Sequence, residues 1–320
     1  MKTFEKKLLK IFLASVLIFI LSVIFSKNQK NAQRPVETAL LNPGFSSDVS
    51  SVLITKKSVS GVSEVRIEKQ GDFWLLSEND GICSFADSKI VNSLIENAAK
   101  LRKIYKISGE YKDFVRLGVD DDGGSLITFS ENNGKTFSKI YFGLENQLKN
   151  RIYFRVDTGK TAYETENDFS QYLTVDLNYW AEPEIFPEIK NPVAISFSGE
   201  NNYSLDEKSR GFASVSHTLL SLRHGKICGN FEDFPELKNP ASSLTVQDGE
   251  GRISKIEFFE KIEKNSTADG EIEKSYFYKK SILAAEIDAQ ENIFAFYSQN
   301  AVYEISLWTF ERIKNAAQDF

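Results

Sequence analysis

A short pattern recurs in the same order in both halves of this 320-residue chain, and it constrains the fold more than any other feature. SKIYFG begins at Ser138, and SKIEFF begins at Ser254. Three further pairs keep that order: Leu101-Arg102 with Leu222-Arg223, Asp113-Phe114 with Asp233-Phe234, and Tyr163-Glu164 with Tyr303-Glu304. Self-similarity in one order predicts an internal duplication. The alternative is two unrelated α+β domains that share common dipeptides.

Each half combines short β-type runs with an amphipathic helix. In the first half, the run from 86 to 104 carries an apolar stripe at helical spacing, with Asp87 or Ser88 able to cap its start. A short helix is predicted at NDFSQYL, and a second amphipathic helix at GFASVSHTLLSLRH. The predicted fold class is α+β: an N-terminal transmembrane helix, then two similar repeats, each a mostly antiparallel sheet with one or two packed helices.

Length, composition and the positions of the prolines predict how the chain is divided into segments. A chain of 320 residues usually exceeds one hydrophobic core, and 41% hydrophobic residues support real cores. Pro183, Pro187 and Pro192 exclude regular structure between the halves. The predicted segments are an anchor at 1–26, a linker at 27–48, a first repeat at 49–180, a proline-rich connection at 181–192 and a second repeat at 193–320. The pair at Tyr163 and Tyr303 is 140 residues apart, whereas the other repeated segments are 116 to 121 residues apart, and a longer hairpin with a charged tip near Asp269 and Gly270 explains the difference.

An uncharged apolar run follows four lysines at the amino terminus, and we interpret it as a membrane anchor. The uncharged part runs from Ile11 to Ser26, and the segment from Leu8 to Phe25 has about the length of a membrane-spanning helix if Lys10 snorkels to the interface. A cleavable secretory signal is the main alternative, although large residues occupy the usual cleavage positions, and a buried soluble helix is the other. The predicted anchor side chains are Leu8, Leu9, Ile11, Phe12, Leu13, Val16, Leu17, Ile18, Phe19, Ile20, Leu21, Val23, Ile24 and Phe25.

Charge predicts where the rest of the chain lies and what it avoids. The lysines before the run place the short tail in the cytoplasm, so the body is expected outside it, in a single-pass protein of the inner or cytoplasmic membrane. Residues 27–320 hold 35 basic and 44 acidic residues, a net charge of −9. Such a body repels nucleic acid, which we do not expect as a partner. Membrane lipid is the expected partner of the helix.

The potential metal and redox residues are few. The run Asp120, Asp121 and Asp122 is a weak candidate for a cation, but its spacing does not match an EF-hand, and a solvated turn is the preferred interpretation. Cys83 and Cys228 are too few for a disulfide framework or a cysteine-based zinc site. We expect both to be reduced and buried, with a single bridge as the alternative.

No catalytic motif stands out. His217 and His224 lie seven residues apart on a predicted helix and are expected to be exposed on its polar face. The chain contains neither G-x-S-x-G nor H-E-x-x-H nor a phosphate-binding glycine-rich loop. We therefore predict no catalytic residues, no cofactor and no enzyme activity.

Several of these features together resemble a known family. They are the short anchor, the FWLL strand before SLIENAAKL, the later IYFG strand and the segment YFRVDTGKTAYETENDF. This combination resembles the domain of unknown function 4340 (DUF4340) family, best from Val49 to about Leu173. The chain departs from the family pattern by lacking a proline after FWLL and by carrying GVDDDGG where a proline-containing turn is usual. The resemblance implies an uncharacterised membrane-linked accessory protein, associated with ABC transporter components of the gliding-motility type.

These observations predict a non-enzymatic accessory or interaction module, anchored in the membrane and auxiliary to an ABC-type transport or motility assembly. The alternative is an envelope protein that binds a small ligand or glycan in a cleft between the repeats, near the segment from Trp180 to Pro192. A deep cleft between the repeats, lined by aromatic and polar groups, would favour the ligand, and a filled, apolar interface between them would favour the accessory module. An envelope hydrolase ranks last.

Overall fold

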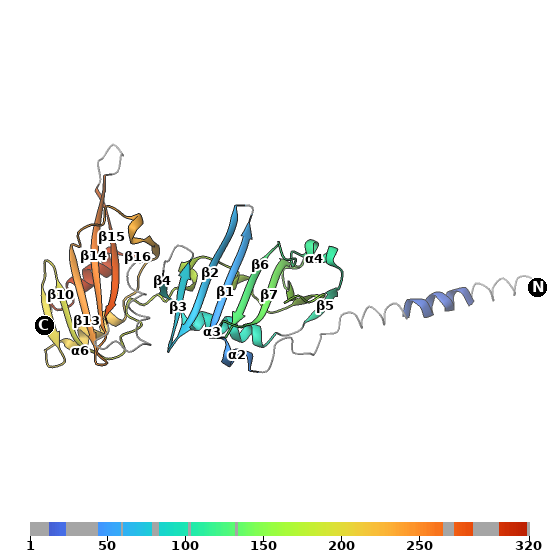
Figure 1. Ribbon diagram of the computed structural model, residues 1–320, viewed down its shortest axis with the longest axis horizontal. Coiled ribbons are helices and arrows are strands. Elements are labelled where there is room, and N and C mark those ends of the chain that lie inside the picture. The colour runs from blue at the N-terminus through green and yellow to red at the C-terminus, as the bar shows by residue number, and fades with distance from the viewer. Residues whose placement is uncertain are drawn as a thin grey trace, which may run out of the picture. The chain divides into compact units, whose positions relative to one another are not determined.

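The structure is a computed structural model that describes residues 13–23, 44–58, 60–78, 83–101, 104–131, 134–264, 272–283 and 301–318. The chain divides into two compact units. Unit 1 comprises residues 1–47, 96–127 and 138–173, and unit 2 comprises residues 48–95, 128–137 and 174–320. As predicted, the fold is mixed α+β, with two mostly antiparallel sheets and few helices (Figure 1).

The first sheet has nine strands in the order β4-β3-β2-β1-β6-β7-β8-β9-β5. Its strands β1 to β5 are Ser51–Ser58, Gly61–Gln70, Phe73–Glu78, Cys83–Phe85 and Tyr105–Ser108. Strands β6 to β9 are Ser125–Ser130, Thr136–Glu145, Ile152–Val156 and Ala162–Thr165. The associated helices are α2 (Phe45–Asp48), α3 (Ser88–Ala99), α4 (Tyr111–Leu117), the 3₁₀ helix η1 (Ser170–Tyr172) and α5 (Leu177–Trp180).

The second sheet has seven strands in the order β11-β10-β13-β14-β15-β16-β12. Its strands β10 to β13 are Pro192–Ser198, Tyr203–Asp206, Ile227–Asn230 and Ser242–Asp248. Strands β14 to β16 are Ile253–Lys264, Ile272–Leu283 and Ala301–Ile305. The associated helices are α6 (Phe212–Leu220), the 3₁₀ helix η2 (Phe231–Asp233) and α8 (Leu307–Lys314).

Both sheets use the same strand order. If β2-β1-β6-β7-β8-β9-β5 are matched in turn with β11-β10-β13-β14-β15-β16-β12, every neighbour agrees, and the first sheet adds only β3 and β4. The pairing of β5 with β9 shifts register between Lys106 and Ser108, and that of β12 with β16 shifts between Ile227 and Gly229. The recurring SKI segments lie in the matched strands β7 and β14.

The predicted helix of the first half is present, and its cap is identified. The Asp87 carboxylate accepts hydrogen bonds from the backbone N–H groups of Lys89 and Ile90, at 2.8 and 3.4 Å, and so begins α3. Its apolar stripe is buried at Val91, Leu94, Ile95 and Ala98. The predicted helix at NDFSQYL is reduced to the three-residue η1.

The predicted anchor is only partly described. Residues 13–23 are helical, whereas Leu8, Leu9, Ile11, Phe12, Ile24 and Phe25 lie outside the described residues. In the parts of the chain that the structure describes, no helix combines the length and apolar character needed to cross a bilayer.

Candidate functional site

The proline-rich connection is packed rather than open. It contains no helix or long strand, as predicted, and carries only the isolated bridges Ala86 to Ala181 and Glu184 to Arg223. Its apolar side chains at Ile185, Phe186 and Ile189 are nevertheless buried. The carboxylate of Glu188 is fully buried, which is rare for an acidic residue unless it is paired.

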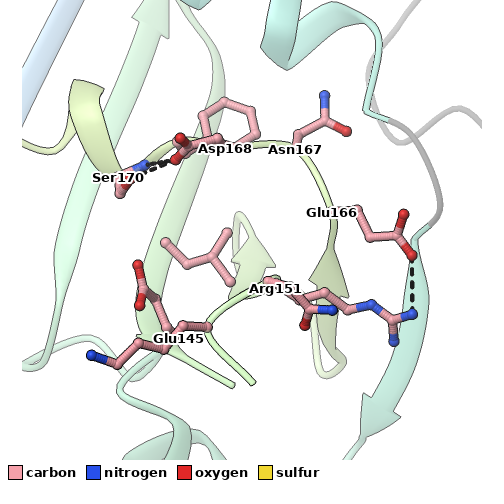
Figure 2. A pocket seen from close by; sticks show the side chains of 10 residues that line it. Glu145, Arg151, Glu166, Asn167, Asp168 and Ser170 are labelled. Atoms are coloured by element: carbon pink, nitrogen blue, oxygen red, sulfur yellow. Dashed lines mark hydrogen bonds and ion pairs between the residues drawn. The ribbon is translucent and has the colours of Figure 1, made fainter. Parts of the chain in front are cut away.

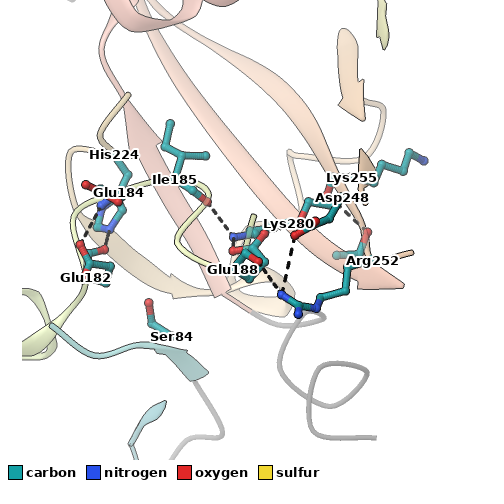
Figure 3. Close-up of polar contacts among 12 residues, drawn as sticks. Ser84, Glu182, Glu184, Ile185, Glu188, His224, Asp248, Arg252, Lys255 and Lys280 are labelled. Carbon is teal, nitrogen blue, oxygen red and sulfur yellow. Dashed lines mark hydrogen bonds and ion pairs between the residues drawn. The ribbon is translucent and has the colours of Figure 1, made fainter. Parts of the chain in front are cut away.

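The partner of Glu188 is Lys280 on β15. The Lys280 ammonium lies 2.6 Å from a Glu188 carboxylate oxygen and donates to the Ile185 carbonyl at 2.7 Å (Figure 3). The two side chains are 5% and 0% exposed. Burial lowers the pKa of Lys280, while the charge of Glu188 opposes that shift. The connection therefore contributes the acidic residue of a buried ion pair, and the second sheet contributes the basic residue.

A polar network extends this pair along the connection. Ser254 on β14 donates to the second Glu188 carboxylate oxygen, and Arg252 donates to the Glu188 carbonyl at 2.7 Å (Figure 3). The same guanidinium lies 3.8 Å from the buried Asp248, which accepts from the Lys190 N–H at 3.1 Å. These contacts satisfy groups that would otherwise be costly to bury.

His224 does not lie where the sequence predicted. It follows the end of α6 and is mostly buried, so the expectation of an exposed imidazole on a helix face was wrong; His217 is exposed, as expected. The His224 Nε2–H donates to the Glu182 carbonyl at 2.8 Å, and the ring packs 5.2 Å from that of Tyr303. Burial lowers the pKa of His224, which favours the neutral ring.

A small cavity adjoins these groups. Tyr278 and Tyr303 stack at 4.7 Å, and the Tyr303 hydroxyl bonds to Ser84 at 3.1 Å. The cavity beside them, lined also by Lys280 and His224, has a volume of about 10 Å³. That volume holds roughly one water molecule. A lysine with a lowered pKa could serve as a nucleophile or base, but no substrate fits beside Lys280 here, so the geometry favours a structural role.

An open pocket in unit 1 was not predicted. It measures about 200 Å³ and lies between the β7–β8 turn and the segment after β9 (Figure 2). Arg151 forms one wall, 2.6 Å from Glu164 and 3.0 Å from Glu166, with its guanidinium 4.2 Å from the Tyr105 ring centre. The bond to Glu164 raises the pKa of Arg151. Asp168 accepts from the Ser170 N–H at 3.0 Å on the other wall. These side chains come together only in the folded sheet.

The acidic run and the cysteines have separate positions. Asp120, Asp121 and Asp122 lie in the turn before β6, where Asp121 forms a 2.5 Å ion pair with Arg155. No group of three potential metal ligands occurs among the residues that the structure describes. Cys228 is a free thiol, as predicted, but it is half-buried rather than fully buried. Cys83 lies in β4.

The comparisons with known proteins agree with the resemblance. Residues 74–209 match the model of a family described as "Domain of unknown function (DUF4340)". This segment belongs to the DUF4340 family. The DUF4340 match includes the buried connection with Glu188 but ends before Lys280. That description assigns no activity.

One curated relative and the solved structures add little. An uncharacterized protein of Treponema pallidum (strain Nichols) is 20% identical over 151 residues, which cover 47% of this chain and 48% of that protein. The chain thus spans about half the length of that relative. No solved structure matches the chain.

Proposed function

We propose that this protein is a membrane-anchored, extracytoplasmic accessory module that binds a protein partner and does not turn over a substrate. The observation that carries the proposal is the filled connection. The alternative function needs a ligand cleft near this connection. The Lys280–Glu188 pair and its neighbours leave only a cavity of about 10 Å³ there. A filled connection favours an accessory role over a ligand-binding cleft.

The helix at 13–23 supports attachment to lipid. Leu17, Ile18 and Phe19 are 60%, 67% and 70% exposed. Successive helix residues point about 100° apart, so three consecutive exposed apolar side chains make the helix apolar on every side. A helix of this kind is stable in a hydrocarbon environment. Membrane lipid is therefore the proposed first partner.

The second proposed partner is a membrane protein, namely a component of an ABC-type transport or motility assembly. This proposal rests on the family resemblance and on the filled connection. Anchoring confines the body beside the bilayer and raises its effective concentration toward other membrane proteins. A modest interface then suffices.

We also propose that the body is an internal duplication. The support is the shared order of seven strands, the equivalent register shift in β5 and β12, and three of the four sequence pairs, which fall in or directly after matched elements. Two unrelated domains would not be expected to share all three. The duplicated sheets provide loops and strand edges for partner binding.

Replacing residues 1–26 by a cleavable export signal tests the accessory role. We expect the released body to keep its fold and lose the membrane proteins that the full chain retains after gentle extraction, because tethering supplies the effective concentration. The measurement is mass spectrometry of the retained proteins, with circular dichroism as the control for folding. Equal recovery of partners by the released body would contradict the proposal.

A small-ligand role remains the second candidate, because the 200 Å³ pocket of Figure 2 presents a fixed guanidinium beside carboxylate, amide and hydroxyl groups. In this proposal the ligand binds in unit 1 rather than near the proline-rich connection. The test is a thermal-shift screen of small polar metabolites against the full chain and its Arg151→Ala variant. A ligand that stabilises only the unmodified chain would favour this role.

A further inference from the structure

The hairpin β14–β15 continues beyond the sheet as a two-stranded arm (Figure 1). The pairing of β13 with β14 ends at Ser242 opposite Phe258, whereas β14 continues to Lys264, where it pairs with Ile272 of β15. The described part of the arm therefore has an edge of β14 with no strand beside it. Such an edge presents backbone groups that can pair with another strand.

The sheet determines which residues face this edge. The Asp248 N–H bonds to the Arg252 carbonyl, and the Ala241 N–H bonds to the Phe258 carbonyl, both at 2.8 Å. Even-numbered residues of β14 thus direct their backbone groups toward β13, and the direction alternates along a strand. Beyond Phe258, the backbone groups of Glu260, Ile262 and Lys264 consequently face outward.

The arm is specific to the second sheet. In the first sheet the matched hairpin turns at residues 146–151, directly after β7. The side chain of Ile262 on the arm is 59% exposed. Additional residues that place an exposed β-branched side chain on an open edge favour an interface.

The sequence of the edge is complementary to itself. It reads Glu-Lys-Ile-Glu-Lys from Glu260 to Lys264. We infer that the β14 arms of two copies of this chain pair antiparallel about a two-fold axis at Ile262. Glu260 then lies opposite Lys264 of the second copy, Lys261 lies opposite Glu263, and Ile262 lies opposite itself. Opposite charges across strands stabilise a pair, and an isologous interface closes as a dimer.

Neighbouring registers are disfavoured by the same charges. The outward backbone groups allow only shifts by two residues. Opposing Glu260 to Ile262 would place Lys261 against Lys261, and opposing Ile262 to Lys264 would place Glu263 against Glu263. Like charges directly opposite one another are destabilising. A parallel arrangement would also bring identical charges together.

Charges within one chain leave this arrangement possible. Lys261 lies 3.1 Å from Glu236, and Glu260 lies 3.6 Å from Lys274. All four side chains are between 32% and 50% exposed, so they can share further partners. The paired edge is short, and we expect dimers chiefly where an anchor concentrates the chain in a membrane. That expectation rests on the proposed anchoring.

A cysteine cross-link tests the axis. In the full chain with Cys83→Ser and Cys228→Ser, an Ile262→Cys variant should form a disulfide-linked homodimer on mild oxidation. Directly hydrogen-bonded antiparallel partners lie about 5.5 Å apart at Cα, within disulfide range. The matched control is Val62→Cys on β2, which is 55% exposed and should remain monomeric. Equal cross-linking of both variants, or of neither, would overturn the inference.

Charge exchange tests the register in the same Ile262→Cys background. We expect Glu260→Lys to reduce the cross-linked fraction about tenfold, because both symmetric pairs become repulsive. Adding Lys264→Glu should restore it, and Glu273→Lys on the opposite strand should change nothing. Failure of the restoring variant, or a cross-link to a different protein, would refute self-pairing. The cross-linked fraction is measured both in membranes and in concentrated detergent. The amount of protein in the membrane fraction reports anchoring separately, so a failure of self-pairing can be distinguished from a failure of anchoring.

Discussion

At the scale of single residues, the Lys280–Glu188 pair is the most consequential feature. We predict that Lys280→Met lowers the free energy of unfolding by about 3–5 kcal/mol, because it leaves the fully buried Glu188 carboxylate without a counter-charge. The double variant Lys280→Met with Glu188→Leu should recover most of this loss, since an apolar pair avoids the desolvation penalty. Urea denaturation of the two variants measures both effects.

A surface pair provides the control. Lys255 lies 2.7 Å from Glu257, and these side chains are 41% and 32% exposed. Lys255→Met should therefore cost less than about 1 kcal/mol. If Lys280→Met were equally mild, the buried pair would not hold the connection in place.

The sequence could not have identified these residues. Glu188 stands among prolines and Lys280 within an alternating strand, and both look like ordinary solvated charges. They form a buried ion pair only because the fold brings together two residues that are 92 positions apart in the sequence. His224 illustrates the same limit, because its helix ends earlier than the apolar pattern suggests.

At the scale of elements, the turn before β6 depends on Gly124. Its φ is +70°, and a Cβ added there would collide with the carbonyl oxygens of Phe142 and Gly118. We predict that Gly124→Ala lowers the free energy of unfolding by at least about 3 kcal/mol, because the backbone oxygens cannot move aside.

Gly134 is the matched control for this substitution. Its φ is +78°, but no atom lies within 4 Å of the added Cβ. Gly134→Ala should therefore cost only the backbone term, about 1 kcal/mol. Similar urea midpoints for the two variants would show that the collision at Gly124 is relieved by movement of the turn.

The sequence predicted the amphipathic helices and the longest hairpin but missed several shorter elements. The helix α3 and the hairpin β14–β15 carry enough apolar periodicity to stand out. The four-residue strands β5 and β12 and the seven-residue α4 do not, because their positions depend on contacts with distant strands. One such contact is between Phe114 and Leu117 of α4 and Ala162 of β9.

At the scale of the whole molecule, the repeated pattern predicted two similar, mostly antiparallel sheets, but it did not predict the order of their strands. In each sheet the last strand, β5 or β12, precedes its neighbour, β9 or β16, in the sequence. The first sheet also carries the additional β3 and β4. Those two strands contribute Leu75 and Phe85 to a cluster with Ile282 of β15. No alternation of apolar residues indicates that contact, so the sequence predicted the sheets but not this joint.

The packing of the connection provides a test of the predicted domain boundary at 181–192. Glu188 and the Ile185 carbonyl both bind Lys280, so a fragment that begins at residue 193 buries Lys280 without either partner. We predict that a fragment of residues 182–320 unfolds cooperatively and is more stable than residues 193–320 by about 3 kcal/mol or more. Both fragments lack β3 and β4, so the loss of that cluster cancels in the comparison. Adding Lys280→Met to the shorter fragment should recover part of the difference, because it removes the unpaired charge. Equal urea midpoints for the two fragments would mean that the connection is only a tether, and the second repeat would then begin at β10.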